Sequence, residues 1–150
     1  MEQIIDIVKI ISGILILIMG FGFHWIGQLI SVMNRDLAIR LGIWEKDNLQ
    51  EYEVYENGIS IADVSLGWIY GVAGAGLLLG YEWGYSLCLI PGFALLYHGI
   101  SFWSWTKNQI KTGHPSSSAK NPIRISWTVC NMLTGALAIM VSLTGLYVFR

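Results

Sequence analysis

Two histidines lie inside stretches of the sequence that otherwise suit a lipid environment. His24 lies in GFGFHWIGQLI, residues 20–30, and His98 lies in ALLYHGISFWS, residues 94–104. Imidazole ionises near neutral pH, binds metals and ligates haem iron. An ionisable side chain at membrane depth is costly to bury, which makes each histidine a candidate functional residue. At ~1.5 Å of helix per residue, both rings are expected roughly 10 Å inside the same membrane face.

Other polar side chains are expected at this face. Asn131 enters the fourth apolar stretch at a similar depth, and Asp63 heads the second stretch nearer the surface. The sequence predicts a polar cavity lined by His24, Gln28, Asp63, His98, Asn131 and Thr134. In such a cavity His24, Asp63 and His98 would handle protons or ions. The alternative for Asp63 is an N-cap or first-turn acid that complements a helix N-terminus.

The two histidines have three interpretations. In the first, neutral imidazoles bond to Gln28, Asn131 or a backbone carbonyl and hold helices together. In the second, His24 and His98 are the axial ligands of a haem b, and neighbouring glycines leave room for the macrocycle. In the third, both line a cavity that opens toward the cytoplasm, through which a proton, an ion or a small solute is transported.

The elements that must position these residues are four apolar stretches. Each has the ~20 residues that a helix needs to cross the hydrocarbon core. They cover residues 10–32, 61–81, 85–105 and 127–149. The sequence therefore predicts an all-α integral membrane protein, a four-helix bundle in one domain, 1–150. Pro91 is expected to kink the third helix.

Small and polar residues recur three or four positions apart in each stretch, and so share one helix face. These sets are Gly13, Gly20, His24, Gly27 and Ser31; Asp63, Gly67, Gly71, Gly74 and Leu78; Pro91, Ala94, His98, Ser101 and Trp105; and Trp127, Asn131, Thr134, Ala138, Ser142 and Gly145. Helices in lipid associate through small residues and polar contacts, so these faces are predicted to point inward.

The connections suggest an orientation. A tight EWG at 82–84 is expected to join the second and third helices, whereas the connections 34–60 and 106–126 are long. The long connections hold seven of the nine lysines and arginines, which favours a cytoplasmic location for them and an outside location for both termini. Within the first connection, Leu37, Leu41 and Trp44 are expected on one face of a short interfacial helix.

Composition and motifs exclude several functions. Of the 150 residues, 54% are hydrophobic and 13% charged, and the net charge of −1 gives no sign of a nucleic-acid partner. Phosphate-binding glycine loops, HExxH, GxSxG and paired carboxylates are absent, so the sequence predicts no catalytic residue and no metal site, and argues against an enzyme. The leading hypothesis is an accessory or structural subunit of a membrane complex, or a homo-oligomer, because glycine-rich faces exceed what one bundle needs. Its partners would be the lipid bilayer and other membrane subunits or copies of itself.

Overall fold

The structure, a computed structural model, describes residues 2–44, 49–113 and 122–148, and every described element is helical. The first span consists of α1 (Glu2–Leu15), the π-helix η1 (Ile16–Trp25) and α2 (Ile26–Met33), followed by the short α3 (Arg35–Arg40). The remaining elements are α4 (Gln50–Leu66), α5 (Trp68–Leu78), α6 (Glu82–Leu87), α7 (Leu89–Lys111) and α8 (Pro122–Val148).

Several of these helices are long and apolar enough to cross a membrane. Among the described residues, Ile5–Met33, Glu82–Lys111 and Arg124–Gly145 meet that condition singly. Helices α4 and α5 meet it together, with a 41° bend between them. The chain therefore has three candidate membrane spans, or four if the bent pair is counted as one span.

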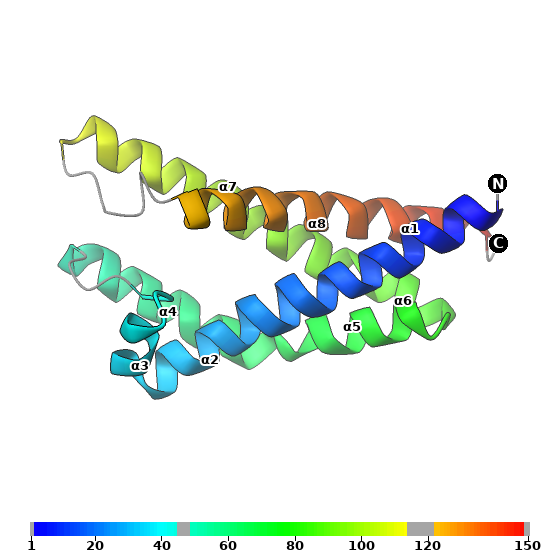
Figure 1. Cartoon of the computed structure of the whole chain (residues 1–150), viewed down its shortest axis with the longest axis horizontal. Helices are drawn as coiled ribbons and strands as arrows, with labels where there is room; N and C mark the ends of the chain where they lie inside the picture. The colour runs from blue at the N-terminus through cyan, green and yellow to red at the C-terminus, as the bar shows by residue number, and fades with distance from the viewer. Residues whose placement is uncertain (1, 45–48, 114–121, 149–150) are drawn as a thin grey trace.

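The helices run back and forth between two ends of an elongated molecule. Figure 1 shows both termini and the turn from α5 to α6 at one end, which we call the terminal end. The other end holds α3, the start of α4, the last turns of α7 and the start of α8, and we call it the connection end. The long connections therefore share one end, as the sequence predicted.

The second predicted span is bent, whereas the third is one long helix. The second begins at Gln50 rather than residue 61 and bends at Gly67, whose backbone N–H donates to Asp63 O. The third runs as one apolar helix over residues 82–111, with the turn residue Cys88 between α6 and α7. Pro91 has no N–H to donate to the carbonyl of Leu87, which explains this interruption.

The predicted tight turn lies three residues too late. Glu82 begins α6, and the chain reverses over Leu79, Gly80 and Tyr81 instead. Gly80 has φ of +76°, a left-handed conformation that favours glycine. Gly80 therefore ends α5, whereas Gly84 packs against the backbone of Gly76 in α5.

The predicted inward face of the first span is confirmed, because Gly13, Gly20, His24, Gly27 and Ser31 are all buried. In the last span Asn131, Thr134, Ala138, Ser142 and Gly145 are buried and Trp127 is half-buried. In the second and third sets only Gly67, Gly74 and Pro91 are buried, and the other members are half-buried. The apolar core lies toward the terminal end and contains Ile16, Leu77, Leu95, Ala138 and Val141.

Many glycines pack inside the chain. A Cβ on Gly74 would lie 2.8 Å from Leu17 Cγ, and one on Gly135 would lie 2.7 Å from the carbonyl oxygen of Gly92. These contacts bring α5 against the first span and α7 against α8. The glycines thus have packing partners within one chain, which removes one argument for association with other subunits; association itself stays a prediction.

The first connection folds differently from the prediction. Asn34 caps α3 by accepting from the Leu37 N–H at 3.0 Å. Leu37 and Leu41 are exposed, whereas Trp44 is buried with the Arg35 guanidinium 3.7 Å above its ring. The prediction that Leu37, Leu41 and Trp44 share one apolar helix face is therefore wrong, because Trp44 lies beyond the end of α3.

Candidate functional site

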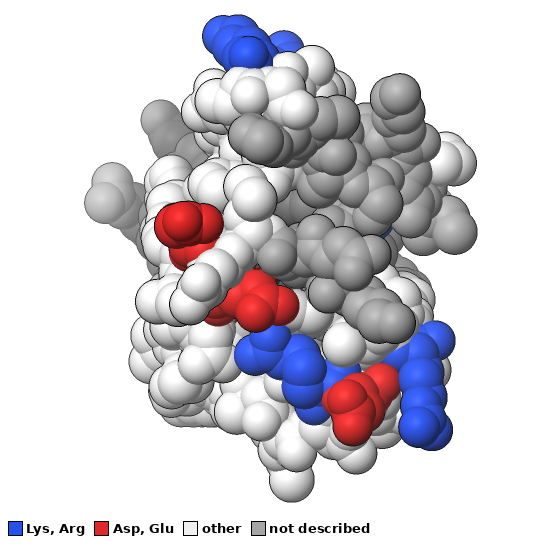
Figure 2. All heavy atoms as spheres, turned by 90° about the vertical axis from the view of Figure 1, so that its left-hand side faces the viewer, with Lys and Arg blue, Asp and Glu red and all other residues white. Residues whose placement is uncertain are grey.

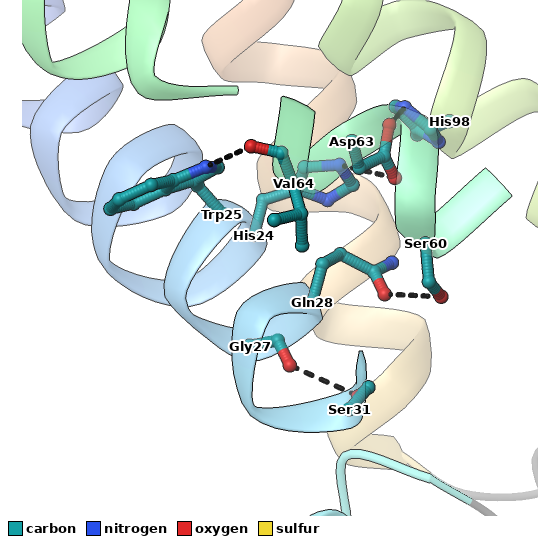
Figure 3. A network of polar contacts seen from close by, with 9 residues as sticks. All are labelled: His24, Trp25, Gly27, Gln28, Ser31, Ser60, Asp63, Val64 and His98. Atoms are coloured by element: carbon teal, nitrogen blue, oxygen red, sulfur yellow. Dashed lines mark hydrogen bonds and ion pairs between the residues drawn. The ribbon is translucent and has the colours of Figure 1, made fainter. Parts of the chain in front are cut away.

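Three ionisable side chains from three helices meet at one point. His24 lies in η1, Asp63 in the last turns of α4 and His98 in α7. His24 Nε2 lies 3.2 Å from Asp63 Oδ2, and His98 Nε2 lies 3.1 Å from Asp63 Oδ1. Figure 3 shows the Asp63 carboxylate between the two imidazole rings. We call these residues the His–Asp–His triad.

The triad is well shielded from solvent. The exposed fractions of the His24, Asp63 and His98 side chains are 2%, 12% and 15%. Within the described part of the chain, neither ring nitrogen of His24 has an aligned hydrogen-bond partner, and nor does Asp63 Oδ2. The close approach of His24 to Asp63 is therefore a contact of nitrogen and oxygen without hydrogen-bond alignment. Polar atoms buried in this way usually have a partner, so the site is incompletely satisfied.

The local structure explains how these side chains converge. His24 lies near the end of a π-helical segment, where the Ile26 N–H donates to Phe21 O rather than to the carbonyl four residues before it. Such segments are rare and often occur at functional sites. Trp25, the next residue, donates through Nε1 to Val64 O at 3.0 Å. This bond fixes the first span against α4 one residue away from Asp63.

Two cavities adjoin the triad. The first, of about 380 Å³, is bordered by His24, His98 and Glu56 together with aromatic residues that include Tyr52 and Trp105. The second, of about 440 Å³, is also bordered by His24, and by Arg124 and Cys130. Both lie among residues of the first span, α4, α7 and α8. His24 borders both cavities and His98 borders the first, whereas Asp63 lies behind the two imidazoles and lines neither.

The connection end is charged. Figure 2 faces this end and shows acidic and basic side chains gathered on it. Some of these charges fix the first connection: Arg124 Nη2 donates to the backbone carbonyls of Gly42 and Ile43, at 3.3 and 3.2 Å. Arg35 Nη2 donates to Asn57 Oδ1 at 3.1 Å, which joins α3 to α4.

Of the six predicted cavity residues, only His24, Gln28 and His98 border the cavities. Asp63 joins the two histidines in the triad, and Gln28 accepts from Ser60 Oγ at 2.8 Å. Asn131 donates to Trp127 O, and Thr134 donates to Cys130 O. Both are buried against their own helix and border neither cavity.

The interpretation of Asp63 as an N-terminal helix acid is wrong. Because α4 begins at Gln50, Asp63 lies in its last turns and the side chain faces two imidazoles. Sequence reasoning also missed Glu56 and Ser60. With Asp63 they follow the spacing of four and three that marks one helix face. That signal was hidden because residues 50–60 were assigned to a polar connection.

The arrangement does not fit a haem held between the two histidines. Axial imidazoles lie on opposite faces of a macrocycle. Here the ring centroids of His24 and His98 are 4.3 Å apart and both Nε2 atoms face the same carboxylate. A porphyrin would have to displace Asp63 and part the two helices.

No family model, no curated protein and no solved structure matches this chain.

Proposed function

We propose that the protein is a multi-pass membrane carrier of a small cation, which enters from the connection end and binds at the His–Asp–His triad. In this proposal α1 through α8 form a four-helix bundle that crosses the bilayer four times, and the broken pair α4 and α5 is the second crossing. The apolar lengths of the spans support it. So do the large apolar side chains that remain exposed along them, among them Ile18, Phe93 and Leu143.

The observation that carries the proposal is the convergence of the triad at cavities near the connection end. Ionisable groups within membrane helices are rare and usually mark ion or substrate pathways. A carboxylate and two imidazoles provide negative charge and lone pairs, which attract a cation. Aromatic rings border the first cavity, among them Tyr52 and Trp105, and aromatic rings also favour cations.

The bend between α4 and α5 supports transport over static binding. Discontinuous helices form the substrate sites of many transporters, because their ends free backbone groups and permit bending. Gly67, at the bend, lies four residues after Asp63. Beyond the triad the apolar core closes the terminal end, so release on that side requires the helices to rearrange at this bend.

Flux into liposomes tests the proposal. The full chain is reconstituted, and uptake of monovalent and divalent cations is measured in separate assays. We expect Asp63→Asn to abolish uptake of the transported cation. Glu51→Gln removes an exposed acid from the same helix and is expected to leave uptake unchanged. Equal uptake by the parent and Asp63→Asn, or none above empty liposomes for any cation, would contradict the proposal.

A further inference from the structure

We infer that the His–Asp–His triad is a binding site for a divalent first-row transition metal of the Zn²⁺ type. Its ligands are His24 Nε2, His98 Nε2 and an Asp63 carboxylate oxygen, and further positions open toward the first cavity. The inference names the substrate class of the carrier and rests on that proposed function for its transport role. The binding itself is testable separately.

The distances fit a shared metal ion. One ligand atom from each of the three residues lies within 4.8 Å of the other two. In a tetrahedral site with bonds of about 2.0–2.2 Å, ligand atoms lie roughly 3.3–3.6 Å from one another. His24 Nε2 lies 3.2 Å from Asp63 Oδ2, and His98 Nε2 lies 3.1 Å from the other oxygen, Oδ1. Both distances are close to that separation, and rotation of the Asp63 carboxylate to bring one oxygen toward both imidazoles would complete the site.

A second observation points to a ligand. His24 is 98% buried as a side chain, since only 2% is exposed, and its Nε2 faces Asp63 without an aligned hydrogen bond. His24 Nε2 and Asp63 Oδ2, 3.2 Å apart and without an aligned hydrogen bond, are therefore available to a shared ligand.

The donor types select the class of metal. Imidazole together with carboxylate suits Zn²⁺, Fe²⁺ and neighbouring first-row ions, whereas Ca²⁺ and Mg²⁺ prefer sites made entirely of oxygen. Three protein ligands leave a position open, as in exchangeable and catalytic sites, whereas structural zinc sites are closed by four. An exchangeable ion is what a carrier requires.

Metal binding is measured on the full chain in mild detergent after removal of metals. Co²⁺ serves as an optical probe of four-coordinate geometry, and Zn²⁺ binding is measured by calorimetry. We expect one Zn²⁺ per chain, the visible absorption of four- or five-coordinate Co²⁺, and no comparable binding of Mg²⁺ or Ca²⁺. Because ligands must be deprotonated, affinity is expected to fall as the pH is lowered.

Variants assign the site. Asp63→Asn keeps the shape of the side chain and is expected to weaken Zn²⁺ binding more than about tenfold, as is His98→Ala. His114→Ala and Glu51→Gln remove a histidine and an acid outside the triad and should bind as the parent does. Zn²⁺ should also raise the thermal midpoint of the parent but not of Asp63→Asn, because only a state that binds is stabilised.

The outcomes separate the two proposals. Zn²⁺ binding that Asp63→Asn abolishes, without flux in liposomes, supports the metal site and overturns the carrier. Flux of a monovalent cation without any binding of Zn²⁺ or Co²⁺ supports the carrier and overturns the metal site. A folded parent that binds neither metal shows that the triad only holds three helices together, which also overturns the metal site.

Discussion

At the scale of single residues, the site depends on contacts that join the first span to α4. Three residues of α4 contact side chains within residues 24–28 of the first span. Ser60 donates to Gln28, Asp63 lies beside His24, and the carbonyl of Val64 accepts from Trp25. Ser60 is 1% exposed and donates to Gln28 Oε1, one helical turn before Asp63. Polar contacts of this kind orient helices in lipid, where apolar burial provides no preference between helix faces.

Ser60→Ala is expected to lower the free energy of unfolding by about 1 kcal/mol, because Gln28 Oε1 loses its donor. Ser65→Ala is the matched control: Ser65 is exposed and donates to Ile61 O in its own helix. That change should stay within about 0.5 kcal/mol. Thermal unfolding in detergent measures both, and equal effects of the two substitutions would show that the contact with Gln28 contributes nothing.

Trp25→Phe keeps the ring volume roughly but removes the indole N–H that donates to Val64 O. Since Val64 belongs to the last turn of α4, its carbonyl is one that a helix end leaves without an internal partner. We expect a loss of about 1 kcal/mol in unfolding free energy.

Trp68→Phe provides the comparison for this indole. Trp68 is 52% exposed and donates to Ser65 O nearby. Its substitution should change stability less than Trp25→Phe does. A larger effect at Trp68 would contradict the role assigned to Trp25.

At the scale of elements, periodicity predicted the existence of the helices better than their ends. Glycine and polar residues at spacing three and four correctly gave the buried faces of the first and last spans. The second span was placed from residue 61 because hydropathy begins there, although helix α4 begins at Gln50. Hydropathy marks only the apolar part of a helix. The polar part of the same helix, residues 50–60, gives no such signal.

The site was predictable in part. His24, Asp63 and His98 were recognisable because ionisable groups are rare in apolar stretches. The sequence also placed them in one cavity, but it did not predict that Asp63 contacts both imidazoles, because that contact depends on the π-helical register of η1 and on the bend at Gly67. Neither follows from a regular spacing of 3.6 residues. A metal site was not expected either, because the three ligands are far apart in the sequence and match no metal-binding motif.

The bend at Gly67 gives an element-scale prediction. A Cβ at this position would lie 2.5 Å from Trp25 Cδ1 and 2.6 Å from Asp63 O. We expect Gly67→Ala to push α4 away from the first span, to lower the thermal midpoint and to weaken Zn²⁺ binding, because Asp63 moves with the helix end.

Gly58→Ala is the control on the same helix. A Cβ there meets nothing within 4 Å, so the substitution should stabilise the helix by up to about 1 kcal/mol. Zn²⁺ binding should be unchanged. If Gly67→Ala were as stable as Gly58→Ala and bound Zn²⁺ normally, the close approach at the bend would have no part in forming the site.

At the scale of the whole molecule, the two ends have different characters. Among the described residues, the connection end holds most of the charged side chains and the cavities, whereas Asp6, Lys9 and Glu82 lie toward the terminal end, where the core is apolar. In the carrier proposal, a cation reaches the triad from the connection end past polar and aromatic groups. The side of the membrane that this end faces would then decide the side from which the site loads.

The excess of lysine and arginine in the long connections predicts that the connection end faces the cytoplasm. Cysteine labelling tests this in intact cells after Cys88 and Cys130 have been replaced by alanine. A cysteine at Lys111, in the last turn of α7, should react with a membrane-impermeant thiol reagent only after the cells are permeabilised. A cysteine added after Arg150 should react in intact cells.

The reverse pattern would place the connection end outside, and the triad would then load from the external solution. Complete labelling of both cysteines in intact cells would contradict the even number of crossings on which the carrier proposal depends. Equal partial labelling of the two cysteines would instead show that the chain inserts in both orientations.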